Sequence, residues 1–193
     1  MQTFNQIDLS ALSLGPVTTD GRGNKRCSVT LNGSAPCFRM PVLRCPFGAS
    51  LFDKEQESSR KNLLFSLTDE VAAFVQTLDR LLLKCAAAKS QELFGTKLSP
   101  DAVEALYTPL LRPSNGDYQP CFRTKVNLSG FRTVRCFEPD LTPRPVPEDW
   151  RCEVQPAVAL THIWFQNKSW GAIVETTHAI IHEADDSCPF ALE

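Results

Sequence analysis

The sequence lacks the patterns that identify membrane proteins and common enzymes. It has no run of 18 or more apolar residues, so no membrane-spanning helix is expected. It also has no Cys-x-x-Cys pair, glycine-rich phosphate loop, His-Glu-x-x-His or Gly-x-Ser-x-Gly segment. Its first ten residues do not resemble a secretory signal or an organelle presequence. These absences predict a protein without enzymatic activity, cofactor or membrane partner, located in an intracellular compartment.

Cysteine is present, but not in a pattern that indicates disulfides or zinc. A chain of 193 residues is long enough to form a core without covalent cross-links, so reduced, mostly buried thiols in a reducing compartment are expected. His178 and His182 lie four residues apart in a predicted strand, which separates them by about 13 Å. That distance is too long for one ion, so no metal site is predicted. The eight cysteines are at positions 27, 37, 45, 85, 121, 136, 152 and 188.

The formal net charge of −2 conceals a strongly uneven distribution. Residues 21–62 contain eight Lys or Arg and three acidic residues, and residues 112–135 contain five and one. The last eleven residues contain four acidic residues and no basic one. Because attraction of phosphate depends on the local field, the two basic segments favour a nucleic-acid partner in spite of the net charge.

Short strands surround a helical segment. Thr68 and Ser99 are suitable N-caps, Pro100 fits a first helical position, and an apolar 3–4 periodicity follows Thr68, so a pair of helices is expected within about residues 68–108. The Asn32-Gly33 turn predicts a hairpin between the first two strands, and a tight turn at 166–169 joins the last two. Strands are predicted at 27–31, 37–44, 61–67, 121–128, 131–137, 151–165 and 170–182.

This order of elements predicts a mainly β fold. We expect an OB-fold-like β-barrel with an inserted pair of α-helices, an α+β arrangement that forms a single domain over residues 1–182. Residues 183–193 are expected to form an acidic, flexible C-terminal tail.

Basic and aromatic residues occur together on the predicted strands. In the strand that begins at Cys121, alternation places Arg123 and Lys125 on one face and Phe122, Thr124 and Val126 on the other. A groove that follows a single nucleic-acid strand needs cations for the phosphates and exposed rings for the bases. The predicted binding residues are Arg39, Arg44, Arg123, Lys125, Arg132, Arg135 and Lys168 for phosphates, with Trp164, Phe165 or Trp170 for bases.

Several segments between residues 46 and 182 also resemble a known family. These segments are Pro46-Phe-Gly48, Lys61-Asn-Leu-Leu-Phe-Ser-Leu67, Leu78-Asp79 and Ser90 to Gly95 in the helical segment, Val103-Glu-Ala-Leu-Tyr-Thr-Pro-Leu-Leu111, Phe122-Arg-Thr-Lys-Val126 and Ile163-Trp-Phe-Gln-Asn-Lys-Ser-Trp-Gly-Ala172. They resemble single-stranded DNA-binding proteins of large DNA viruses of eukaryotes, which are similar in plan to the OB-fold binders of T7-like phages. The resemblance implies a role in DNA replication, recombination or repair, in the host nucleus or at a viral replication site.

The C-terminal tail shows a second resemblance to single-strand binders. Asp185-Asp186-Ser-Cys-Pro-Phe190 resembles the acidic end of bacterial single-strand binders, although Ala191-Leu-Glu193 follows the phenylalanine here. This resemblance implies that Asp185, Asp186 and Phe190 contact replication proteins. The acidic tail could also occupy the protein's own basic groove.

The residues leave alternatives open. The same strands could bind protein, as in a virion or scaffold interaction module. A stacking groove also accepts RNA unless it reads the 2′-hydroxyl group. An enzyme of unknown type would require a deep pocket with converging polar groups. The preference for DNA rests on the resemblance, and the sequence leaves a homo-oligomer open.

Overall fold

A computed structural model describes residues 1–182 except 22, 51–58, 114–115, 117–118 and 167–168. The tail residues Asp185, Asp186 and Phe190 and the predicted groove residue Lys168 therefore lie outside the described residues, and what was predicted for them stays a prediction. No helix in the described part of the chain is long and apolar enough to cross a membrane.

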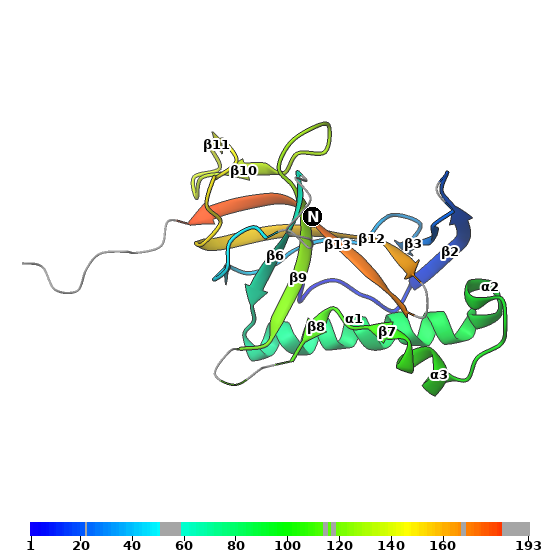
Figure 1. Ribbon diagram of the computed structural model, residues 1–193. Coiled ribbons are helices and arrows are strands. Elements are labelled where there is room, and N and C mark those ends of the chain that lie inside the picture. Colours follow the sequence, from blue (N-terminus) through cyan, green and yellow to red (C-terminus); the bar gives the residue numbers. More distant parts are fainter. Residues whose placement is uncertain (22, 51–58, 114–115, 117–118, 167–168, 183–193) are drawn as a thin grey trace, which may run out of the picture.

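The centre of the fold is one long hairpin. Strand β12 (Glu153–Gln166) pairs with β13 (Ser169–His182) in antiparallel register from Glu153 opposite His182 to Gln166 opposite Ser169. This hairpin was predicted from the sequence, because its two strands are long, β-branched and joined by a short turn. Figure 1 shows the two strands running side by side through the middle of the molecule.

The remaining strands join the two outer edges of this hairpin. Along the free edge of β12 lie β3 (Lys25–Leu31), β4 (Cys37–Arg39) and β5 (Leu43–Arg44), each opposite a different part of β12. Along the free edge of β13 lie β7 (Tyr107–Thr108), β9 (Cys121–Asn127) and β10 (Arg135–Phe137), all parallel to it. The outer partners are β1 (Gln2–Thr3), β2 (Leu12–Thr19), β6 (Arg60–Ser66), β8 (Leu111–Arg112) and β11 (Pro143–Arg144).

Two details of this sheet differ from the sequence prediction. The predicted turn at Asn32-Gly33 is present, because Leu31 and Ser34 on either side of it form an antiparallel bridge. However, β3 does not pair with β4: each pairs with β12, and β2 is the other neighbour of β3. The first 26 residues contribute β1, β2 and the start of β3, none of which was predicted from the sequence. The fold is mostly β, as predicted. The pairings of the described strands form an open, branched sheet and not a closed ring, and the OB-fold-like barrel therefore stays a prediction.

Three helices follow β6, where a pair was expected. Helix α1 (Asp69–Ala88) begins at the N-cap Thr68, whose hydroxyl accepts a hydrogen bond from the Val71 amide. The predicted long helix is interrupted at Lys89, after which α2 (Ser90–Phe94) ends at Gly95 with a positive φ of 77°. Helix α3 (Pro100–Ala105) has Ser99 as its cap. Figure 1 shows α1 lying along one side of the strands, with α2 and α3 near one of its ends.

The core lies between α1 and the sheet. The buried face of α1 is made by Val71, Val75, Leu78, Leu82 and Ala86, at the spacing that the sequence predicted. Trp150, Phe38, Phe65 and Phe122 are among the large side chains packed in the same cluster.

One buried carboxylate connects α1 to the segment that contains β7 and β8. Asp79 is only 7% exposed, and it accepts hydrogen bonds from the Tyr107 hydroxyl at 2.6 Å and from the amides of Leu110 and Leu111 at 3.0 and 3.1 Å. Burial raises the pKa of Asp79, and these three donors oppose that rise. The carboxylate thereby fixes the position of the segment that precedes Arg112.

The seven cysteines within the described residues are free thiols, and Cys27, Cys45 and Cys136 are buried. Burial raises the pKa of Cys45 and that of Cys136 to about 11. Such thiols are packing groups with little thiolate character.

Candidate nucleic-acid interface

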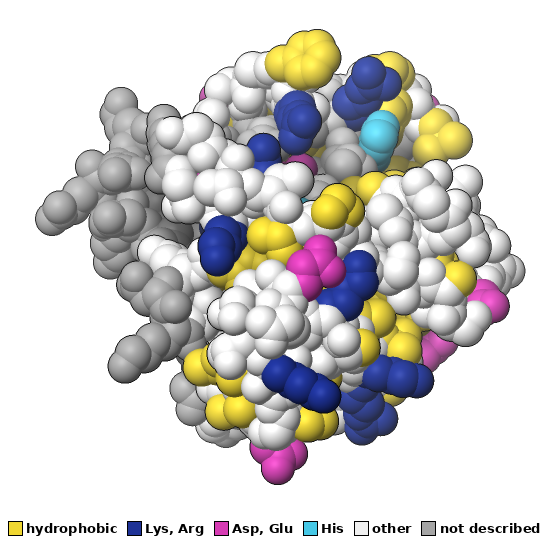
Figure 2. All heavy atoms as spheres, turned by 90° about the vertical axis from the view of Figure 1, so that its right-hand side faces the viewer, with side chains coloured by type: hydrophobic (Ala, Val, Ile, Leu, Met, Phe, Trp, Pro, Cys, Tyr) yellow, Lys and Arg dark blue, Asp and Glu magenta, His cyan; other side chains and the backbone are white. Residues whose placement is uncertain are grey.

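A groove of about 780 Å³ runs across the end of the β12–β13 hairpin. Its lining is strongly basic and partly aromatic, with seven Lys or Arg side chains and two acidic ones. Figure 2 shows one face of the molecule on which several Lys and Arg side chains lie near hydrophobic ones. We call this feature the basic groove, and it is lined by Asp20, Asn24, Lys25, Arg26, Arg60, Thr108, Arg112, Arg123, Lys125, Arg132, His162, Trp164, Phe165, Gln166, Ser169, Ile173 and Glu175.

Strand β9 supplies two of the cations, as its sequence predicted. Its residues alternate between the core and the groove: Phe122, Thr124 and Val126 are buried, whereas Arg123 and Lys125 are partly exposed in the groove. The alternation follows from the two-residue period of a strand with one face against the core.

The neighbouring strands bring further charges to Lys125. Glu175 on β13 lies directly opposite Lys125 in the parallel register, and Arg60 on β6 forms an ion pair of 2.5 Å with Glu175. Burial, followed by the nearby charges of Arg123 and Arg60, lowers the pKa of Lys125 to about 8. Burial and the charge of Arg112 likewise lower the pKa of Arg123. The fold therefore holds several cations close together at an electrostatic cost, which is typical of functional sites.

The opposite wall comes from the N-terminal strands and was not predicted from the sequence. Lys25 and Arg26 begin β3, where Arg26 lies opposite Trp164 on β12. Arg112 on β8 was missed as well. Membership of the basic segments 21–62 and 112–135 was a signal for these residues and for Arg60. However, only the pairing of distant strands shows that these residues meet.

The two aromatic residues at the end of β12 lie in the groove. Trp164 and Phe165 are both partly exposed and line it, and the prediction that they contact bases stays a prediction. Gly171 is the cross-strand partner of Trp164, and a β-carbon at that position would come within 2.9 Å of the indole. The absence of a side chain at Gly171 therefore lets the indole lie directly against β13.

Trp170 requires a correction. It was predicted as a possible stacking ring, but it is fully buried, and its indole N–H donates to the Val103 carbonyl at 2.9 Å. It packs against Tyr107, with ring centroids 4.4 Å apart, and against Phe94. Because α3 and β7 cover this side of the hairpin, Trp170 is a core residue and cannot stack on a base.

Arg39, Arg44 and Arg135 also do not line the basic groove. Arg39 and Arg44 lie opposite Ala157 and Glu153 of β12, which are about 23 and 36 Å along the strand from Trp164. Arg135 is placed opposite His178 on β13, also far from the hairpin turn. The sequence predicted their exposure, but it did not show at which end of the long hairpin each would lie. Arg132, in contrast, does reach the groove.

Phe131 is an aromatic residue that was not among the predicted binding residues. It directly precedes the groove residue Arg132, and its side chain is fully exposed. A tight turn holds it: Gly130 has φ of 86°, and its carbonyl accepts hydrogen bonds from both the amide and the hydroxyl of Thr133. An exposed phenylalanine on a constrained turn beside a basic groove is available for contact with a ligand.

The three histidines are potential metal ligands. Within the described ranges of the chain there is no group of three or more His, Cys, Asp or Glu side chains that could hold a metal ion. His162 lies in the groove, where burial, followed by the charge of Arg60, lowers its pKa.

Comparison with known proteins gives a likeness in fold. No protein-family model and no curated protein sequence matches the chain. Among solved structures, the single-stranded DNA-binding protein from bacteriophage Enc34 in complex with single-stranded DNA aligns with a TM-score of 0.50 and 8% identity, over 90% of this chain and 97% of that one. The single-stranded DNA-binding protein gp2.5 of bacteriophage T7 aligns with a TM-score of 0.48 and 14% identity, over 81% and 97% of the two chains.

Proposed function

We propose that this chain is a single-stranded DNA-binding protein without enzymatic activity, and that the basic groove holds the strand. The observation that carries the proposal is the group of partly buried cations around Lys125, next to the rings of Trp164 and Phe165. Placing like charges together in a half-buried site costs free energy, which the lowered pKa of Lys125 reflects. A phosphate backbone in the groove would offset that cost.

The cations and the aromatic rings of the basic groove contact different parts of the DNA strand. Phosphates bind along Lys25, Arg26, Arg112, Arg123, Lys125 and Arg132, and bases stack on Trp164 or Phe165. Stacking on a protein ring requires bases whose faces are free, which favours a single strand over a duplex. Since every base has a flat face and every nucleotide a phosphate, little sequence specificity is expected.

The likeness to the Enc34 protein supports the proposal, because that protein has the same overall fold and is seen in complex with single-stranded DNA. Within the proposal, the chain acts in replication, recombination or repair of a viral genome, in a reducing compartment such as the host nucleus. The tail residues Asp185, Asp186 and Phe190 are proposed to contact partner proteins.

A titration with three ligands tests the proposal. Oligo-dT, oligo-U and a duplex of equal length are titrated while the intrinsic tryptophan fluorescence is recorded at 50 and 200 mM salt. We expect oligo-dT to bind more tightly than the duplex and to lose affinity steeply with salt, by a slope of about 0.7 per phosphate contact. The proposal is contradicted if oligo-dT and the duplex bind with equal affinity, or if neither binds. Tighter binding of oligo-U than of oligo-dT would indicate that the ligand is RNA.

A further inference from the structure

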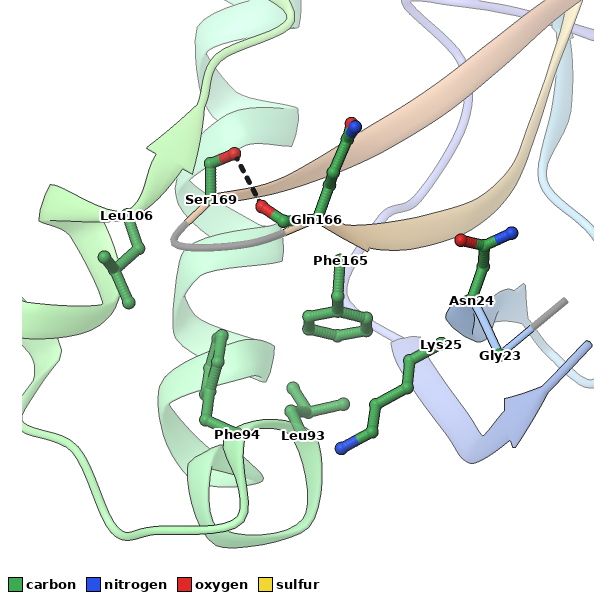
Figure 3. Close-up of a pocket in the computed structure, with 9 residues that line it drawn as sticks. All are labelled: Gly23, Asn24, Lys25, Leu93, Phe94, Leu106, Phe165, Gln166 and Ser169. Carbon is green, nitrogen blue, oxygen red and sulfur yellow. Dashed lines mark hydrogen bonds between the residues drawn. The ribbon is translucent and has the colours of Figure 1, made fainter.

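A second depression, of about 420 Å³, opens beside the turn of the β12–β13 hairpin. We call it the side hollow. It shares five lining residues with the basic groove, so the two are continuous. Its volume lies in the range of sites that hold small organic molecules. It is lined by Gly23, Asn24, Lys25, Leu93, Phe94, Leu106, Phe165, Gln166 and Ser169 (Figure 3).

The side hollow has an apolar wall with a fixed ring. Phe94 and Phe165 meet edge to face with their centroids 5.6 Å apart, and Phe94 also contacts the buried Trp170. Leu93, which is 1% exposed, and Leu106 complete the wall. Because Phe94 holds the Phe165 ring from one side, that ring keeps its orientation without a ligand, which lowers the entropic cost of stacking against it.

The rim of the side hollow is polar and carries a cation. Figure 3 shows the Phe165 ring between Phe94 and the Lys25 side chain. Asn24 and Gln166 line both the side hollow and the basic groove. The Ser169 hydroxyl donates to the Gln166 carbonyl at 3.2 Å, which stabilises the start of the turn. The apolar wall suits the face of a base, the amide groups of Asn24 and Gln166 suit the base edge, and the Lys25 ammonium group suits a phosphate.

We propose that the side hollow holds one nucleobase of the strand that lies in the basic groove. The base turns away from its neighbours and packs against Phe165, and Lys25 contacts the adjoining phosphate. This inference rests on the proposed function. It adds that one nucleotide of the bound strand is held differently from the others, so the strand has a defined register on the protein.

An abasic scan tests the inference. A single abasic residue is placed at each position in turn of an oligo-dT just long enough to bind fully. In the wild type, one position should lower the affinity by about 5-fold or more, the value of one stacked base, and the other positions by less. In Leu106→Phe, which fills the side hollow, and Phe94→Ala, which removes its wall, this position should become equal to the others.

The matched control is Leu83→Phe, the same substitution at a half-buried leucine of α1 that lines neither the groove nor the hollow. It should keep the wild-type abasic profile. Fluorescence of 2-aminopurine placed along the strand in the wild-type complex needs no variant, and it should identify the same single position. A flat profile in the wild type with intact oligo-dT binding overturns this inference alone. Loss of oligo-dT binding altogether overturns the proposed function with it.

Discussion

The indole of Trp164 lies so close to Gly171, its cross-strand neighbour, that a β-carbon there would come within 2.9 Å of the ring and 3.1 Å of the Thr108 carbonyl. Real β-carbons essentially never approach other atoms to 2.9 Å, so a side chain at Gly171 must displace the indole or the strand. The position of the Trp164 indole in the groove thus depends on the absence of a side chain at Gly171.

Gly171→Ala should therefore weaken oligo-dT binding about as much as Trp164→Ala does, by roughly 1–3 kcal/mol. It should also lower the free energy of unfolding by about 1–3 kcal/mol, because an extra methyl group is forced into a packed contact. Fluorescence titration and urea unfolding measure the two effects. Gly21→Ala is the control, since a β-carbon at Gly21 meets nothing within 4 Å. Wild-type affinity for oligo-dT in Gly171→Ala would show that the Trp164 indole does not contact the bound DNA.

Removing charge from β9 should weaken binding, whereas removing charge from the far end of the hairpin should not. Arg123→Ala and Lys125→Ala should each lower the salt-dependence slope by about 0.7, because each loses a phosphate contact. Arg39→Ala and Arg44→Ala are matched controls, because both residues are exposed on strands but lie outside the basic groove. Equal effects of all four substitutions on binding would contradict the placement of the bound DNA in the basic groove.

Binding should take up a proton at alkaline pH. The pKa of Lys125 is about 8, lowered mainly by burial and further by Arg123 and Arg60. A phosphate beside Lys125 favours its charged form and raises that pKa in the complex. Above pH 8 the free protein is therefore less protonated than the complex, and affinity falls by up to about tenfold per pH unit.

Titrations at pH 7, 8 and 9 measure this dependence, and calorimetry in two buffers of different ionisation enthalpy counts the protons. Lys125→Arg keeps its charge across this range and should lose most of the pH dependence. A variant whose affinity falls with pH as steeply as that of the wild type would show that another group titrates.

Phe131 should contribute to binding although it contributes little to the fold. Its side chain is fully exposed, so Phe131→Ala should change the free energy of unfolding by less than about 0.5 kcal/mol. If the ring stacks on a base, the same substitution should weaken oligo-dT binding by about 1–3 kcal/mol. Leu141→Ala, at another exposed loop residue, is the control. Unchanged affinity in Phe131→Ala removes this ring from the interface.

Asp79 should be important for stability. Asp79→Ala leaves the Tyr107 hydroxyl and the amides of Leu110 and Leu111 without their acceptor, at about 1–3 kcal/mol for each buried donor. We expect a loss of about 3 kcal/mol or more in urea unfolding. Tyr107→Phe removes one of the three hydrogen bonds and should cost about 1 kcal/mol. Similar losses in the two variants would mean that the backbone amides find other partners.

Local patterns predicted the parts of the site that a single element determines. The alternation of Arg123 and Lys125 with Phe122 and Thr124 is readable in the sequence, since a strand with one buried face repeats every two residues. The same holds for the apolar stripe of α1 and for the long terminal hairpin. These features depend only on neighbours along the chain.

The missed residues depend on pairing between distant strands. Lys25 and Arg26 join Arg123 only because β3 pairs with β12, and the Asn32-Gly33 turn instead suggested a local hairpin with the next strand. Trp170 was misassigned because a tryptophan beside a turn gives no sign that α3 will cover it. Which face of an amphipathic hairpin receives a helix is decided by tertiary packing.

The walls of the basic groove come from residues between Asp20 and Glu175, almost the whole described length of the chain. No fragment of the fold contains a complete groove, so binding competence and global folding are thermodynamically linked. Bound single-stranded DNA should therefore stabilise the folded state, by about 2.7 kcal/mol at a DNA concentration one hundred times the Kd. In a cell, free protein would be the form most exposed to unfolding and proteolysis, and its survival would follow the supply of its ligand.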